Sequence, residues 1–258
     1  MAESYKPKVA TKRRASDLWE FIKTLIYAVL IAVVIRTFAY EPFNIPSGSM
    51  MPTLLIGDYL FVSKFSYGYS RYSLPWGLPL VTGRILFTPP QRGDVVVFIL
   101  PRDGSTDYIK RIVGLPGDRI QVIHGLLYVN GQPVKVERTE DYVMQEPDGP
   151  AVHVPQFIET LPNGVRHPIL KRTDEGILNN TQVYVVPPDH YFAMGDNRDN
   201  SLDSRVPPEA GGVGFVPAEN LVGRAEFRFF SIDERARLWE VWKWPFAVRY
   251  GRLFRGIH

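Results

Sequence analysis

Two short segments of the chain carry residue types that could together break an amide bond. Residues 45–54, IPSGSMMPTL, place Ser47 and Ser49 on either side of Gly48, which lets a ligand approach the backbone closely. A serine hydroxyl attacks a carbonyl carbon once a base takes its proton, and Lys110 in YIKRIV could be that base. Ser47 could direct its hydroxyl, with the Ser49 amide, at the oxyanion that then develops.

Lys110 can act as a base only when it is neutral. An ordinary lysine pKa of about 10.4 leaves roughly one molecule in a thousand deprotonated near pH 7.5, and burial would have to lower it. In a strand, Lys110 and Ile112 would share the face toward the core, while Arg111 would point to solvent. Taken singly, the segments also fit a flexible Ser-Gly-Ser linker and a solvated lysine on an edge strand.

A third segment, residues 195–205 (GDNRDNSLDSR), is rich in Asp and Asn. Its order of residues lacks the glycine and the distal glutamate of a calcium loop, so Asx turns are the ordinary interpretation. Asp203 and Arg205 could pair and brace the segment, and Ser201 could turn inward to hold the lysine.

Other chemistries find little support in the sequence. The five histidines show neither metal-ligand spacing nor HExxH, and there is no GxSxG motif. The absence of cysteine excludes disulfides and a thiol nucleophile, and a net charge of +3 is too small to indicate nucleic acid. We therefore expect no metal and no cofactor.

Residues 18–40 form the apolar stretch that would position these segments. Its uncharged centre, residues 24–35, spans only about 18 Å of helix, but Lys23 and Arg36 could extend their charged ends outward. This predicts one transmembrane helix; a cleavable signal peptide and a buried core helix are the alternatives. Basic residues precede the stretch, so the N-terminus should be cytoplasmic and everything after Tyr40 outside. These are Lys6, Lys8, Lys12, Arg13 and Arg14.

The remainder of the chain is patterned as β-strands, without alternating helices, which predicts an antiparallel β architecture. The expected strands are 94–100, 108–113, 119–123 and 126–129 (a hairpin around His124-Gly125), 183–186, 191–194 and 221–230. The aromatic segments 69–80 and 238–246 suit a membrane interface as well as a core. The expected organisation is a basic N-terminus (1–17), the helix (18–40), a catalytic β domain in two parts (41–131 and 181–258) and an inserted β subdomain (132–180).

Four motifs in this order resemble the bacterial type I signal peptidases, membrane-bound Ser-Lys endopeptidases that remove signal peptides from exported preproteins. They are PSGSMMPTLLIGD (46–58), RGDVVVF (92–98), YIKRIVGLPGD (108–118) and MGDNRDNSLDSR (194–205). The resemblance implies that Ser49 is the nucleophile and Lys110 the general base. It also implies that Ser47 contributes to the oxyanion hole, that Ser201 hydrogen-bonds Lys110, and that Asp203 pairs with Arg205.

The resemblance further implies a mostly β catalytic core with an inserted second β domain. The pockets for the small residues at −1 and −3 of an Ala-x-Ala site would be lined by Phe43, Ile45, Met50, Leu54, Tyr108 and Ile109. The substrate would bind as an added strand. The expected setting is the bacterial inner membrane, with the catalytic domain on the extracytoplasmic side, and the expected partners are preproteins, the lipid bilayer and the export machinery.

Two other functions stay open at this point. One is a related Ser-Lys peptidase dedicated to a single pilus or conjugation substrate. The other is a non-catalytic, membrane-tethered β module that binds extended peptides.

Overall fold

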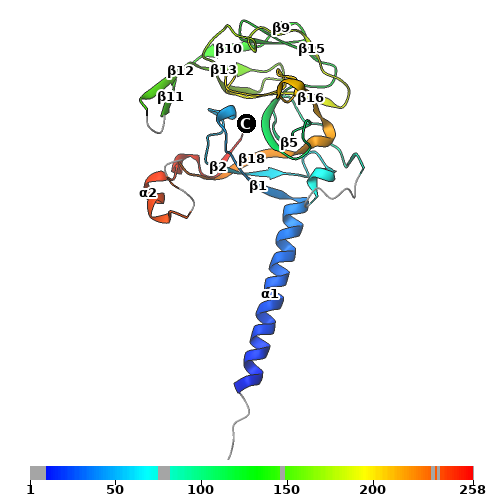
Figure 1. The fold of residues 1–258 in the computed structure, drawn as a ribbon, viewed down its shortest axis with the longest axis vertical. Helices are drawn as coiled ribbons and strands as arrows, with labels where there is room; N and C mark the ends of the chain where they lie inside the picture. The colour runs from blue at the N-terminus through cyan, green and yellow to red at the C-terminus, as the bar shows by residue number, and fades with distance from the viewer. Residues whose placement is uncertain (1–9, 75–81, 146–148, 234–235, 237–238, 258) are drawn as a thin grey trace, which may run out of the picture.

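A long helix, α1 (Ala10–Phe38), stands away from a body of antiparallel sheets (Figure 1). This computed structural model describes residues 10–74, 82–145, 149–233, 236 and 239–257. The architecture confirms the mostly β fold with one N-terminal apolar helix. Parts of the predicted aromatic segments 69–80 and 238–246 lie outside the described residues, as do residues 1–9.

Within α1, Asp17–Phe38 is long and apolar enough to cross a membrane, with a mean hydropathy of 2.1 and no burial against the body. Its 22 residues span about 33 Å, close to the ~30 Å of a hydrocarbon core. The expected end at Tyr40 is wrong by two residues: the helix ends at Phe38, and Tyr40 already begins strand β1 (Tyr40–Asn44). Pro42 explains this, because it disfavours helical geometry at Glu41.

The main sheet has eight strands in the order β1-β2-β18-β5-β6-β16-β17, with β19 added beside β18. Four of them match expected strands: β5 (Val95–Ile99), β6 (Asp107–Gly114), β16 (His190–Met194) and β18 (Leu221–Ser231). The sequence missed β1 and β2 (Asp58–Ser63), whose short runs contain Glu41, Pro42 and Asp58. The edge strands are completed by β17 (Val216–Pro217) and β19 (Arg255–Gly256).

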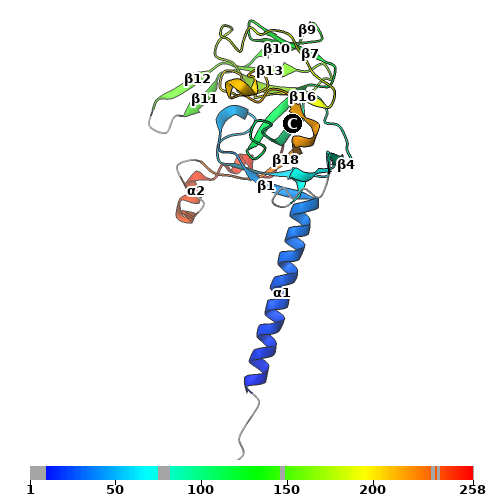
Figure 2. The same cartoon turned by 45° about the vertical axis from the view of Figure 1, so that its right-hand side comes forward.

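Smaller sheets lie at the end of the body opposite α1 (Figures 1 and 2). The predicted hairpin forms as β7 (Arg119–Ile123) and β8 (Leu126–Val129), extended by β9 (Gln132–Pro133) and β15 (Tyr184–Val185). The expected division at residue 132 thus falls between β8 and β9 of one sheet. The rest of the insertion forms β10 (Lys135–Arg138), β13 (Gln156–Thr160) and β14 (Arg166–Leu170), and the hairpin β11 (Tyr142–Gln145) and β12 (Ala151–Val154).

The C-terminal segment returns along the main sheet on the same side of the body as α1 (Figures 1 and 2). It contains α2 (Trp244–Ala247), and the side chains of Trp242 and Phe246 are exposed. Arg252 reaches back to the Asp58 carboxylate, with contacts of 2.5 and 3.1 Å. Short elements complete the described chain: strands β3 (Tyr69–Ser70) and β4 (Arg84–Ile85), and 3-10 turns at Gly48–Met50, Arg71–Ser73, Pro208–Ala210, Ala218–Asn220, Val241–Lys243 and Tyr250–Arg252.

Candidate active site

Ser49 lies in a 3-10 turn, Gly48–Met50, that follows β1. The ends of this loop are tied together, because Ile45 N donates to the Asp58 carbonyl oxygen and Gly57 N donates to that of Ile45. Met50 adds an anchor, since its side chain is fully buried in the core. Ser49 itself is 8% exposed, and its hydroxyl opens into a cleft. The loop is therefore a fixed support rather than a flexible linker.

Lys110 meets Ser49 from strand β6. Its Nζ lies 2.8 Å from Ser49 Oγ and donates at 2.9 Å to the Ile109 carbonyl oxygen. Only 3% of Lys110 is exposed, and this burial lowers its pKa from 10.5 to about 8, although Asp203 and Asp196 act in the opposite direction. The two segments, 61 positions apart, thus form a close pair in which the lysine loses its proton far more readily than a solvated one.

The Asp- and Asn-rich segment clamps the Ser49 turn from the other side. Asn197 N donates to the Ser49 carbonyl oxygen at 3.0 Å, and Asn197 Nδ2 donates to that of Gly48 at 3.0 Å. Asp203 and Arg205 form the expected ion pair, fully buried, with N–O distances of 2.9 Å. Burial raises the pKa of Asp203, but Arg205 and the Gly195 amide outweigh it and hold the carboxyl ionised.

The expected hydrogen bond between Ser201 and Lys110 does not form. Ser201 is buried and lines the same cleft, but its Oγ has no hydrogen-bond partner among the described residues. The Ile109 carbonyl oxygen and Ser49 Oγ instead accept from Lys110. Ser47 Oγ lies 3.4 Å from Ser49 Oγ, on the exposed rim of the turn.

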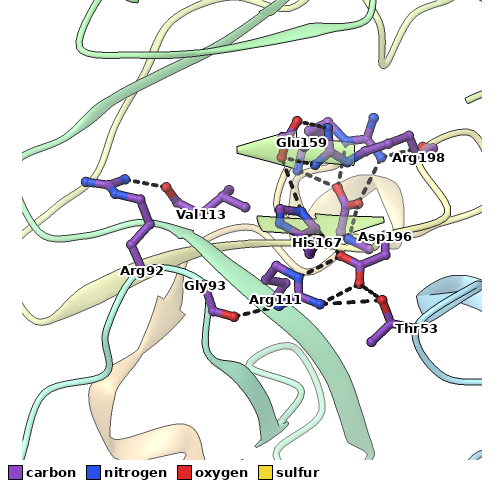
Figure 3. A network of polar contacts seen from close by, with 12 residues as sticks. Thr53, Arg92, Gly93, Arg111, Val113, Glu159, His167, Asp196 and Arg198 are labelled. Carbon is purple, nitrogen blue, oxygen red and sulfur yellow. Dashed lines mark hydrogen bonds and ion pairs between the residues drawn. The ribbon is translucent and has the colours of Figure 1, made fainter. Parts of the chain in front are cut away.

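The prediction that Arg111 points to solvent is wrong. Arg111 is fully buried and makes a bidentate ion pair with Asp196, at 2.9 Å from Nε to Oδ1 and 2.8 Å from Nη2 to Oδ2 (Figure 3). Thr53 Oγ1 also donates to Asp196, at 2.5 Å, which ties the loop after Ser49 to the same carboxylate. Both faces of β6 are covered, so alternation along the strand could not identify a solvent face.

The insertion supplies the cover over Arg111. Glu159 on β13 pairs with Arg198, and His167 Nε2 on β14 lies 3.3 Å from Glu159 Oε1 and 3.8 Å from Asp196 Oδ1 (Figure 3). Burial raises the pKa of Glu159, but Arg198 and His167 outweigh it and keep the carboxyl ionised. The insertion is thus joined to the catalytic half through a buried charge network.

A cleft of about 580 Å³ opens beside Ser49 and Lys110. Of the expected pocket residues, Phe43, Ile45, Tyr108 and Ile109 line it. Met50 and Leu54 do not: both are fully buried in the core, because the turn directs them away from the cleft. The sequence gave no signal for several other lining residues, which come from distant loops: Val97, Thr106, Asp107, Leu178, Asp199, Asn200 and Leu202.

Comparisons with known proteins agree on one family. A family model described as signal peptidase, peptidase S26, matches residues 18–230. A signal peptidase I from Rickettsia canadensis (strain McKiel) is 40% identical over 270 residues, covering 97% of each chain. One from Rickettsia typhi (strain Wilmington) is 41% identical over 96% of this chain and 97% of its own length. The crystal structure of a signal peptidase I from Enterococcus faecalis is 28% identical, covers 53% of this chain and 97% of that chain, and has a TM-score of 0.32.

Proposed function

Since the chain belongs to the signal peptidase family S26 and is accordingly a serine peptidase, we propose that Ser49 and Lys110 are its catalytic dyad. Its substrates would be exported preproteins, cleaved after an Ala-x-Ala sequence. The observation that supports this most directly is the 2.8 Å contact between Lys110 Nζ and Ser49 Oγ at the floor of the cleft.

In this mechanism, neutral Lys110 takes the proton of Ser49 as Oγ bonds to the scissile carbonyl carbon. The Ser47 hydroxyl and the Ser49 N–H, at the start of a 3-10 turn, would stabilise the oxyanion. The C–N bond then breaks, and Lys110 passes its proton to the leaving amine. Lys110 next takes a proton from water, which attacks the acyl-enzyme and releases the signal peptide with Ser49 restored.

Substrate recognition would combine apolar pockets with strand addition. The partly buried Phe43, Tyr108 and Ile109 offer shallow apolar surface, which a small side chain at −1 or −3 can occupy without clashing. Residues 107–110 pair with β5 on one side, whereas the described pairing with β16 begins at Arg111. An extended peptide could therefore hydrogen-bond along this free edge.

Membrane anchoring by α1 fits this function. Asp17–Phe38 can span a bilayer, and the exposed Trp242 and Phe246 lie on the side of the body where α1 leaves it (Figure 2). With the basic N-terminus in the cytoplasm, the cleft would open on the extracytoplasmic side of the inner membrane. The export machinery would deliver preproteins to it.

Cleavage should distinguish this function from its alternatives. Full-length protein in detergent should cut several unrelated preproteins after Ala-x-Ala, and replacing the −1 Ala by Leu should block cleavage. Cutting of one dedicated pilus or conjugation substrate alone would favour the specialised peptidase. Binding of signal peptides without any cutting would overturn the proposal in favour of a peptide-binding module.

Activity should rise with pH because only neutral Lys110 can take the Ser49 proton. With a pKa of about 8, kcat/KM should increase about tenfold per pH unit below pH 8 and level off above it. Because the pKa is lowered on folding, the unfolded chain holds this proton more tightly, so the contribution of Lys110 to stability improves between about pH 8 and 10.5. A pH–rate profile with a fixed peptide measures the first effect, and a rate that is flat from pH 6 to 9 would contradict it.

Gly195→Ala should disturb the dyad without touching it. A β-carbon there would clash with Ser201 Oγ and lie 2.6 Å from the Ser49 carbonyl oxygen, so the backbone of the turn would have to move. We expect a loss of about 1–3 kcal/mol in stability and about a 10- to 100-fold loss in kcat/KM. Gly251→Ala, whose added carbon meets nothing within 4 Å, is the matched control. Equal behaviour of the two variants would show that the turn has room to adjust.

A further inference from the structure

We infer that the insertion contributes a specificity wall to the cleft, in which Leu178, together with Leu202, binds the side chain of the first residue after the scissile bond. This inference rests on the proposed function. It adds a contact on the leaving-group side of the dyad and gives the inserted region a part in substrate selection.

The cleft has two walls of different origin. Phe43, Ile45, Tyr108 and Ile109 form one wall, which the proposed function assigns to residues before the scissile bond. Leu178 and the segment 199–202 form the other, beyond Ser49 on the side where Asn197 clamps the turn. An extended substrate passes Ser49 once, so the residues that follow the cut must face this second wall.

The geometry of a strand selects which residue this is. Side chains alternate between the two faces of an extended chain, so −3, −1 and +1 point in the same direction. If −3 and −1 point into the cleft, the +1 side chain does so as well, just past Ser49. The second wall is therefore the surface that the +1 side chain meets.

Leu178 and Leu202 present apolar surface without serving the core. Leu202 is 52% exposed although its neighbours Ser201 and Asp203 are buried. Neither leucine belongs to a hydrophobic cluster of the described residues. Ser201 between them and the dyad is buried, lines the cleft and has no hydrogen-bond partner in the described part of the chain, as expected where a substrate completes the site.

The wall is held rigidly, so it can discriminate. Arg205 Nη1 donates to the Leu178 carbonyl oxygen at 3.2 Å while the same guanidinium pairs with Asp203. Asn179, which is buried, donates to Asp199 Oδ1 at 2.8 Å, and the other oxygen of Asp199 accepts from Arg172 N at 2.6 Å. The loop carrying Leu178 is thus fixed to the segment that carries Ser201 and Leu202.

The test compares peptides that differ only at +1, with Leu, Ala or Asp, cleaved by the full-length enzyme in detergent. The wild type should prefer Leu to Asp by about tenfold or more in kcat/KM. Leu178→Asp should remove or reverse this preference while leaving the preference for Ala over Val at −1 unchanged. Leu178→Ser and Leu202→Ser should weaken it without adding a charge, and they keep the test open if Leu178→Asp does not fold.

Ile177→Asp is the matched control, because Ile177 is the adjacent residue, is 88% exposed and is not part of the cleft wall. It should keep the wild-type preference at +1. A wild type indifferent to +1, Leu178 variants that slow every peptide equally, or an Ile177→Asp effect as large as that of Leu178→Asp would each overturn the inference. Failure of the wild type to cut any peptide would instead overturn the proposed function.

Discussion

Lys110→Arg should be as inactive as Lys110→Ala, with kcat/KM lowered by about 10⁴-fold or more. The mechanism requires a neutral base 2.8 Å from Ser49 Oγ, and burial prepares Lys110 for this by lowering its pKa to about 8. Arginine keeps its proton at any working pH, so the same burial cannot convert it into a base. Cleavage of an Ala-x-Ala peptide by each variant measures the effect.

The control for this loss must separate chemistry from folding. A guanidinium forced into a site that is 3% exposed can also destabilise the protein, so Lys110→Met, uncharged and similar in length, should be equally inactive with an unfolding midpoint near that of the wild type. Ser49→Ala supplies the reference for complete loss. If Lys110→Arg retained more than about one per cent of wild-type activity, Lys110 would not be the base.

Asp196→Ala should be the most destabilising of the proposed single substitutions, by about 3–5 kcal/mol. It leaves Arg111 buried without its bidentate partner and releases Thr53, which binds the loop after Ser49. Burial raises the pKa of Asp196, but Arg111, His167 and Thr53 outweigh it and lower the pKa overall, so this stabilisation is present at neutral pH and is lost only at acid pH. Denaturant unfolding of the full-length protein in detergent measures it.

A double-mutant cycle shows whether the loss comes from the ion pair. Arg111→Ala should cost a similar amount, and the double variant should cost clearly less than the sum, since it leaves no unpaired buried charge. Glu137→Ala, which breaks the exposed contacts with Lys135 and Arg166, should leave the unfolding midpoint almost unchanged. Strict additivity at Arg111 and Asp196 would contradict the prediction.

The sequence alone predicted the parts of the fold that local chemistry specifies. The hairpin of β7 and β8 has the expected boundaries because two apolar runs meet at His124-Gly125, where both residues have positive φ. The apolar stretch predicted α1, and the motif order identified Ser49 and Lys110 as partners. Strands β10 to β14 were not individually predicted, because their short, half-exposed runs lack a clear period.

What the sequence determined by itself was the family, the β architecture and the pair of residues that could carry the chemistry, since these follow from residue type and order. Only the tertiary structure decided how the two faces of β6 are covered, and hence that Lys110 is buried beside Ser49 and Arg111 is buried against Asp196. It also placed Met50 behind the cleft and Leu178 on its wall. The physical reason is that strand alternation separates two faces without saying what packs on each, and the covering elements come from 50 to more than 100 residues away along the chain.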